Sequence, residues 1–428
     1  MKYNLKIPLF LLFFYIVHTP ELYTQTAYIQ SFKAGEGLSQ SNITSLLQDS
    51  RGFLWIGTQD GLNRYDGYEF STFKNNPGDT NCISNNTINT LLESDKGNIW
   101  IGTNNGLNRY NPYTGEFKNF FSTGEDNSGL PQNRIFSLYQ DKDGMIWIKT
   151  MYYLSKYNPQ TNAFKNYKHF NDYFNYYEGA NNNTLLEDKQ DRLWVGTKDG
   201  LNMFNKELEI FKRFYHKPGD ENSLSNNRVQ VLYQDSEENI WVGTNHGVNK
   251  LNPDKGTFER YYVNKAMDNP VARNSFNVLL EDEEGVFWAG TEGGLFKFDK
   301  NTGNFELATE LMISNNRLTS GSIRAMDQKR GNIVWVGTLQ GLLKIQKNLK
   351  NFNLFKNNQN NKPLFDNNII ASIFKQDENR IWIGTWNSGL YIFNPHTLET
   401  IHYTDSKSFI PDNNIHSLFK DSKNRLWI

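Results

Sequence analysis

The chain has 428 residues, of which 45 are basic and 46 acidic, and its formal net charge is −1. This balance gives no electrostatic basis for binding nucleic acid. The single cysteine, Cys82, excludes a disulfide bond within the chain, and we expect it to be a small buried hydrophobic residue rather than a reactive thiol.

Residues 1–27 predict a signal peptide. Lys2 and Lys6 precede an apolar run from Ile7 to Val17, and polar residues follow this run as far as Ala27. The run is too short to span a bilayer, which needs about 20 residues. We therefore expect export to the periplasm, with an uncleaved anchor as the alternative.

Nine of the ten tryptophans recur at intervals of 45 or 47 residues. An internal repeat of this length, built from short β-type segments, is typical of one propeller blade per repeat. The recurring residues are Trp55, Trp100, Trp147, Trp194, Trp241, Trp288, Trp335, Trp382 and Trp427. Identical spacing predicts identical interior environments, so we expect each of them to anchor a blade. Burial of about 200 Å² by each ring is worth roughly 5 kcal/mol as an upper bound.

Each repeat contains four short runs, which we name strands a, b, c and d. In the first repeat, strand a begins at Ile43, strand b surrounds Trp55, strand c surrounds Tyr65 and strand d covers residues 70–73. A glycine three residues before the tryptophan predicts the a–b turn, and a second glycine two residues after it leaves room for the ring or the next blade. Four antiparallel strands therefore make one blade.

The ends of the repeats predict how the ring closes. Residues 28–32 match strand d, as closure requires if the last blade supplies only strands a, b and c. The c–d hairpin, which has the form Asn-Pro-x-Thr-Gly in other repeats, changes at residues 345–350, and this change indicates the end of the ring. Repeat four also lacks the proline of this hairpin. The sequence predicts an all-β fold with a seven-bladed β-propeller at 28–346 and the first blades of a truncated second propeller at 347–428. Since the chain stops inside a ninth repeat, we expect it to be the amino-terminal piece of a longer protein.

Repeat three departs most from the pattern and supplies the candidate ligand site. It loses two glycines between Trp147 and Leu154, and its d–a connection is rich in Tyr, Phe, Lys and Asn. Both segments should lie on one face of the ring, where aromatic faces and polar groups would suit a neutral or acidic sugar. Packing onto the ring, or contact with a second protomer, is the alternative. The candidate residues are Lys149, Tyr152, Tyr153, His169, Tyr173, Tyr176 and Tyr177, together with Trp386 in the b–c turn of repeat eight.

The sequence shows no catalytic or metal-binding motif. The seven histidines lack metal-ligand spacing, and no serine-hydrolase or zinc-protease motif occurs. Recurrent aspartates belong to equivalent turns of different blades, too far apart for a glycosidase pair, so we expect them to cap turns. These are Asp49, Asp141, Asp188, Asp235 and Asp282. We expect no catalytic residue, no metal and no cofactor within these residues.

The repeat Leu-Trp-Ile-Gly-Thr-x-x-Gly-Leu-Asn-Arg-Tyr, preceded by Gly-Leu-Ser-x-Ser-x-Ile at residues 37–43, resembles the two-component-regulator propeller repeat. The resemblance implies the periplasmic sensor region of a Bacteroidetes-type hybrid two-component system, which detects an oligosaccharide and controls genes for polysaccharide use. It also implies a later membrane helix, a histidine kinase and a DNA-binding output module. We expect a homodimer that meets the membrane only through such a later segment and makes no nucleic acid contact itself.

Two other classes of function remain open at this point. One is an exported carbohydrate-active enzyme, a lyase or hydrolase, on a propeller. The other is a non-catalytic scaffold for protein contacts.

Overall fold

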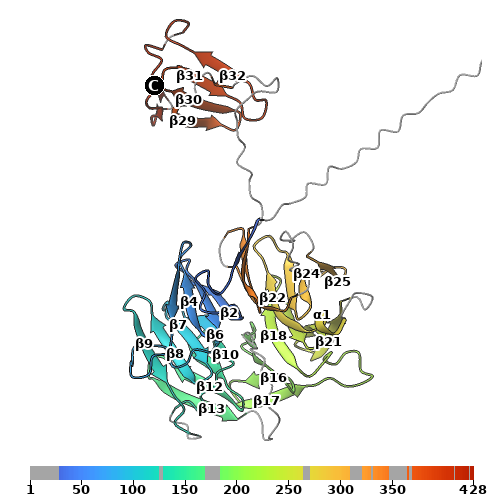
Figure 1. Ribbon diagram of the computed structural model, residues 1–428. Helices are drawn as coiled ribbons and strands as arrows, with labels where there is room; N and C mark the ends of the chain where they lie inside the picture. The colour runs from blue at the N-terminus through green and yellow to red at the C-terminus, as the bar shows by residue number, and fades with distance from the viewer. Residues whose placement is uncertain are drawn as a thin grey trace, which may run out of the picture. The chain divides into compact units, whose positions relative to one another are not determined.

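The computed structural model describes residues 28–124, 129–168, 184–263, 270–308, 321–328, 331–346, 364–365, 369–408, 410–423 and 425–428. It divides into two compact units, Met1–Leu349 and Lys350–Ile428 (Figure 1). The predicted signal peptide lies outside the described residues. That segment and the predicted domain limits 28–346 and 347–428 stay predictions.

The first unit consists of four-stranded antiparallel sheets, and in the first six of them the strands follow chain order. Blade one contains β2 (Ile43–Gln48), β3 (Leu54–Thr58), β4 (Gly61–Tyr65) and β5 (Phe70–Phe73). These four strands are the predicted strands a, b, c and d.

The next five blades repeat this order. Blade two contains β6 (Ile88–Glu93), β7 (Ile99–Thr103), β8 (Gly106–Asn111) and β9 (Glu116–Phe120), and blade three contains β10 (Ser137–Gln140), β11 (Ile146–Lys149), β12 (Tyr153–Asn158) and β13 (Ala163–Lys168). Blade four contains β14 (Leu185–Glu187), β15 (Leu193–Thr197), β16 (Gly200–Asn205) and β17 (Ile210–Phe214), and blade five contains β18 (Val229–Gln234), β19 (Ile240–Thr244), β20 (Gly247–Asn252) and β21 (Thr257–Tyr261). The short helix α1 (Pro270–Arg273) precedes blade six, which contains β22 (Phe276–Glu281), β23 (Phe287–Thr291), β24 (Gly294–Asp299) and β25 (Asn304–Leu307).

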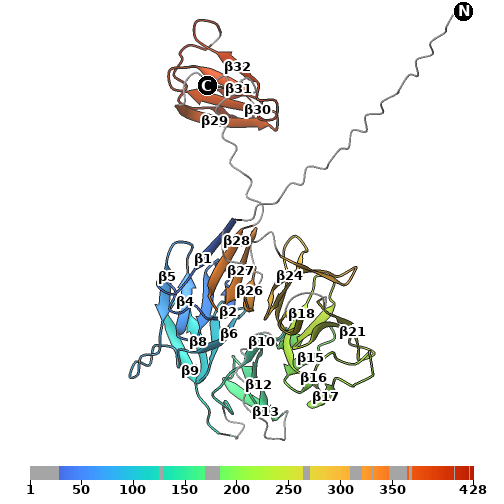
Figure 2. The same cartoon turned by 45° about the vertical axis from the view of Figure 1, so that its right-hand side comes forward.

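The amino-terminal strand completes the seventh blade. Strand β1 (Tyr28–Phe32) pairs antiparallel with β28 (Gly341–Gln346), from Tyr28 opposite Gln346 to Phe32 opposite Leu342. Strands β27 (Ile333–Thr338) and β26 (Ile323–Asp327) follow, so that the order is β1-β28-β27-β26 (Figure 2). Each inner strand contacts the inner strand of the next blade, and β26 contacts β2. The first unit is therefore a closed ring of seven blades, as the sequence predicted.

The second unit repeats the blade pattern. Its four-stranded sheet contains β29 (Ile370–Asp377), β30 (Arg380–Thr385), β31 (Leu390–Phe393) and β32 (Thr400–Tyr403), and a further pair joins β33 (Phe419–Lys420) to β34 (Leu426–Trp427). The indole N–H of Trp382 donates to Oε1 of Gln376, six residues before it, at 2.8 Å. This is the start of a second propeller.

The blade tryptophans of the ring are interior. Those of the seven blades, from Trp55 to Trp335, are at most 5% exposed. In six of the seven blades a glycine follows the tryptophan by two and faces the next blade: a Cβ built on Gly57 would lie 2.8 Å from Ile88 Cγ2 on β6. A side chain at this position would separate neighbouring blades, because protein interiors leave no room for an extra methyl group.

In five blades of the ring, blade one and blades three to six, one carboxylate in the a–b turn fixes both the turn and the tryptophan. Asp49 Oδ1 accepts the backbone N–H groups of Arg51 and Phe53, while Asp49 Oδ2 accepts the indole N–H of Trp55 at 3.0 Å. We call this arrangement the Trp–Asp clasp. It recurs with indole-to-carboxylate distances of 2.7 Å in Asp141–Trp147, 2.8 Å in Asp188–Trp194, 2.8 Å in Asp235–Trp241 and 2.6 Å in Asp282–Trp288. The capping role was predicted, and the indole bond was not.

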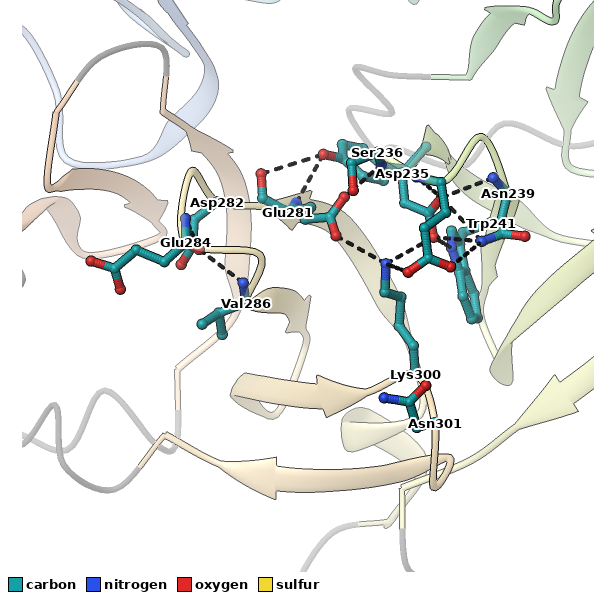
Figure 3. Close-up of polar contacts among 12 residues, drawn as sticks. Asp235, Ser236, Asn239, Trp241, Glu281, Asp282, Glu284, Val286, Lys300 and Asn301 are labelled. Atoms are coloured by element: carbon teal, nitrogen blue, oxygen red, sulfur yellow. Dashed lines mark hydrogen bonds and ion pairs between the residues drawn. The ribbon is translucent and has the colours of Figure 1, made fainter.

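A lysine joins neighbouring blades through these turns. Lys300, which follows β24 in blade six, reaches Asp235 of blade five and pairs with Asp235 Oδ2 at 3.2 Å and Glu281 Oε1 at 2.9 Å (Figure 3). Burial opposes ionisation of Asp235, but hydrogen bonds from Trp241, Asn239 and Lys300 outweigh it and hold its pKa below the usual range. Lys206 pairs in the same way with Asp141 and Glu187. Lysine thus replaces the hairpin proline of other repeats and links two blades.

The clasp predicts a large effect of Asp282→Ala. This variant removes the cap on the N–H groups of Glu284 and Val286 and leaves the buried indole N–H of Trp288 unsatisfied. We expect the free energy of unfolding to fall by roughly 2–4 kcal/mol. Denaturant unfolding checks this, with Asp254→Ala as the control because the Asp254 side chain is 83% exposed. Equal effects of the two variants would contradict the role of the clasp.

The ion pairs of Lys300 predict a pH-dependent loss in Lys300→Met. The pKa values of Asp235 and Glu281 are lowered in the folded chain, so the stability that they contribute is present above their unfolded pKa and is lost as the pH falls through the folded pKa. The variant should therefore have a lower melting temperature than the parent at pH 7, and the difference between the two melting temperatures should narrow toward pH 3. The exposed Lys255, changed to Met, should show no such difference. A difference independent of pH would argue against the ion pairs.

Candidate functional site

Polar side chains gather at the start of the inner strands because of a recurrent β-bulge. The register of strands a and b shifts between Ile43 and Ser45 in blade one, and at the equivalent positions of blades two, five, six and seven. A bulge adds one residue and redirects its side chain. The added residues are all polar: Thr44, Asn89, Gln230, Asn277 and Arg324.

Three of these residues line a cavity of about 410 Å³, which we call the channel mouth. Its volume lies within the range of small-molecule sites. The wall comes from blades one, two, three and seven of the ring, which are far apart in sequence. The lining residues are Gln40, Asn42, Ile43, Thr44, Gln59, Thr87, Asn89, Asn104, Arg134, Arg324 and Leu339.

Farther along the same inner strands the space becomes small. A cavity of about 20 Å³ lies among Leu46, Leu91, Val231, Val278 and Met326 together with polar residues that include Ser45 and Arg324. This space holds about one water molecule.

Hydrogen bonds between blades hold the bulge residues in place. Asn89 Nδ2 donates to Asn104 Oδ1 at 3.0 Å and to the carbonyl of Ile135 at 2.9 Å. In blade six, Asn277 Nδ2 donates to Glu292 Oε1 and to the carbonyl of Ile323, each at 3.0 Å. Glu292 Oε1 also pairs with Arg324 Nη1 at 3.3 Å. The polar groups at this end of the ring are thus preorganised, as binding sites require.

The buried polar atoms of the channel mouth include Arg324 Nε, a donor, and Gln40 Oε1, an acceptor, neither of which has a hydrogen-bond partner. Most buried polar atoms in proteins are hydrogen-bonded, so each exception needs a physical explanation. Both atoms have almost no accessible surface, so a ligand in the mouth would reach them only after the side chains rearrange.

The structure places the predicted residue Lys149 inside the ring rather than on its face. Lys149 takes the position of the glycine that faces the next blade. Lys149 Nζ donates to Thr184 Oγ1 at 2.9 Å and to the carbonyl of Gly196 at 2.6 Å, both on blade four. Burial lowers the pKa of the Lys149 ammonium to about 7. The expected position on the face of the ring needs this correction, since polar groups of blade four accept the ammonium inside the seam.

The other predicted residues are not brought together by the described part of the chain. Tyr153 is buried at 7% exposure, and half-buried Tyr152 donates its backbone N–H to Gln132 Oε1, close to Arg134 in sequence. Trp386 of the second unit is 45% exposed, with its ring edge-on to His416. His169, Tyr173, Tyr176 and Tyr177 lie outside the described residues. Ligand contact by any of the eight residues stays a prediction.

Sequence reasoning missed the channel mouth. Its residues come from chain segments as far apart as Gln40 and Leu339, and no one repeat shows more than a few of them. An alignment of the repeats contains a signal for this cavity. The second residue of strand a varies and is often polar, whereas a strand that lines a packed core would have an apolar residue there. Arg134 and Arg324 stand out in such an alignment.

Within the described residues, no group of three or more His, Cys, Asp or Glu residues is placed to hold a metal ion. In the same part of the chain, no helix has the length and apolar character needed to cross a membrane.

A closed ring of four-stranded blades with interior tryptophans defines a β-propeller protein. Segments in both units match the family described as two component regulator propeller, so the chain carries the repeats of this family and the predicted family is confirmed. The matched residues are 37–60, 82–105, 129–152, 177–199, 223–246, 363–387 and 410–428.

Similar proteins agree with this family. A protein named histidine kinase P4, from Formosa agariphila, is 49% identical over 55 residues, which are 13% of this chain and 4% of that protein. The extracellular domains of the "putative hybrid two component system" proteins BT3049 and BT4673 from B. thetaiotaomicron share the fold, with TM-scores of 0.60 and 0.58 and identities of 23% and 20%. Each match covers 94% of this chain and about half of the other, 52% and 51%.

The propeller fold is also shared with an enzyme. A streptogramin B lyase structure matches with a TM-score of 0.56 at 12% identity, over 76% of this chain and 99% of the lyase. At this identity the likeness concerns the fold alone.

Buried Lys149 predicts that Lys149→Met stabilises the ring in a pH-dependent way. The pKa is about 7 in the folded chain and 10.5 for an unperturbed lysine, so the unfolded chain binds more protons between these values and the parent gains stability as the pH rises. Below pH 7 the cost of burying the charge is fully present. The gain in melting temperature from Lys149→Met should be largest below pH 7 and should decline toward pH 10.

Thermal unfolding at a series of pH values tests this, with Lys168→Met on the same blade as the control because Lys168 is exposed. A gain that does not change with pH, or one that the control shares, would contradict the assignment.

Proposed function

We propose that this chain is the extracytoplasmic ligand-sensing module of a hybrid two-component sensor histidine kinase. Its ligand is an oligosaccharide, and the signal passes to transcription of genes for polysaccharide use. The supporting observation is the recurrence of two component regulator propeller repeats in both units. The chain spans about half of the structurally similar extracellular domains and a small part of the similar histidine kinase.

The arrangement of polar groups supports binding rather than catalysis. The channel mouth contains amides, hydroxyl groups and guanidinium groups, which hold sugar hydroxyls and anions, and the described residues that line it include no carboxylate or histidine to serve as an acid–base pair. Binding at the ring would act by favouring one of two arrangements of the units or of a dimer, and so bias a kinase beyond the membrane.

We expect the purified chain to bind members of an oligosaccharide panel and to release no product from them. Titration calorimetry measures the binding, and chromatography of the incubated sugars detects turnover. Accumulating product would favour the exported enzyme instead, and neither heat nor product would favour a protein-interaction scaffold. In the native organism, deletion of the gene should abolish induction of polysaccharide-utilisation genes by the sugar that binds, and unchanged induction would contradict the sensory role.

A further inference from the structure

Blade two lacks the carboxylate of the Trp–Asp clasp. Ser94 stands where blade one and blades three to six have aspartate, six residues before the blade tryptophan. Blade five allows a direct comparison, because both turns have asparagine four residues and tryptophan six residues after this position. These residues are Asn98 and Trp100 in blade two, and Asn239 and Trp241 in blade five. The two turns therefore present the same side-chain donors and differ in the acceptor.

In blade five, one carboxylate accepts hydrogen bonds from four N–H groups of the turn. Asp235 Oδ1 accepts the backbone N–H groups of Glu237 at 3.1 Å and of Asn239 at 2.8 Å. Asp235 Oδ2 accepts the side-chain amide of Asn239 at 3.0 Å and the indole N–H of Trp241 at 2.8 Å. This turn thus binds a carboxylate through two backbone donors and two side-chain donors.

The equivalent four donors of blade two have no acceptor within the described part of the chain. They are the backbone N–H groups of Lys96 and Asn98, the side-chain amide of Asn98 and the indole N–H of Trp100. Ser94 is too short to replace aspartate, and its Oγ donates to the carbonyl of Asn98 at 3.3 Å instead. Because an unpaired donor in a partly buried site lowers stability, an acceptor that enters this turn would be held there.

The space of the missing carboxylate belongs to a cavity of about 150 Å³ between blades two and three. Ser94, Asn98 and Trp100 line one side of it, and Met145 and Pro159 of blade three line the other. The amide of Asn98 and the indole N–H of Trp100 both keep accessible surface, although the Trp100 side chain is only 2% exposed. A small molecule in this cavity therefore reaches the donors directly.

The charges around the cavity are balanced. Half-buried Arg109 and exposed Lys96 line it, and neither forms an ion pair with another described residue. Asp95 and Asp143 also line it, but both are exposed, so that water screens their charges. The site thus selects a ligand by the geometry of its four N–H donors rather than by a strong positive field.

We infer that the a–b turn of blade two binds the carboxylate group of a small organic acid, which takes the place of the missing aspartate side chain. One carboxylate oxygen accepts the backbone N–H groups of Lys96 and Asn98, and the other accepts the indole N–H of Trp100. The cavity is smaller than the sites that hold drug-sized molecules, so the acid is small. The turn follows the end of strand a, whereas the channel mouth surrounds its start, so this site is separate from the proposed sugar site.

Nuclear magnetic resonance of the purified chain tests the inference, with acetate as the simplest carboxylate and glucuronate as a sugar acid. We expect the indole N–H signal of Trp100, assigned with Trp100→Phe, to shift in a saturable way with at least one of the two. The clasped indole groups already have an acceptor, so their signals should stay in place. Sodium chloride at the same ionic strength is the control for a general effect of salt.

Two variants of Ser94 separate binding from folding. Ser94→Asp supplies the carboxylate from the chain itself, so it should raise the melting temperature and weaken binding of the acid by about tenfold or more. A rise in melting temperature is a result that misfolding would not produce. Ser94→Ala is the matched control, because it leaves the space open, and it should bind the acid as the parent does.

Three results would each overturn the inference. They are the absence of a saturable shift of the Trp100 indole signal with both acids, an equal shift with sodium chloride, and binding by Ser94→Asp as tight as that by the parent. None of them bears on the sensory function, whose test is the binding of an oligosaccharide panel. Failure of that test would likewise leave the carboxylate site standing.

Discussion

The hydrogen bond from a blade tryptophan to the aspartate of the preceding turn is the interaction on which the ring depends. A tryptophan supplies the largest apolar area of any side chain, but its indole N–H must be satisfied when the ring is buried. The Asp carboxylate meets this need with Oδ2 while Oδ1 caps two backbone N–H groups of the a–b turn. Side-chain burial and turn geometry are thus fixed by the same residue, six positions away.

The clasp recurs in blade one and in blades three to six, which share nearly the same geometry, and β1 closes the ring. That strand supplies the outer edge of blade seven from the opposite end of the ring's sequence. The seams between blades are where individual residues differ. Lysines 206 and 300 link adjacent a–b turns, and in one seam Lys149 replaces a glycine and donates to Thr184 of the next blade. The residue at the bulge of strand a differs from blade to blade, so blades of similar geometry present different side chains to the channel mouth.

The sequence predicted much of the fold, and the reason is physical. The tryptophan period, the turn glycines and the strand-d character of residues 28–32 are local patterns that every repeat reports again, so the strands, the interior tryptophans and the closing pair followed from them. The indole bond did not follow, because Asp282 and Trp288 meet only once the intervening turn folds back. The burial of Lys149 did not follow either, since its partner Thr184 lies 35 residues away and meets it only across a seam. The channel mouth escaped prediction for the same reason: its residues meet only when seven blades close a circle.

Hydrogen exchange of the tryptophan indole N–H groups tests the central claim most directly. Nuclear magnetic resonance can follow each indole signal after transfer to deuterated water, with single Trp→Phe variants to assign them. The account predicts that the clasped groups of Trp55, Trp147, Trp194, Trp241 and Trp288 exchange orders of magnitude more slowly than that of Trp386, whose side chain is 45% exposed. Comparable exchange rates for all six would show that the carboxylates do not hold the tryptophans, and would contradict the account of the ring.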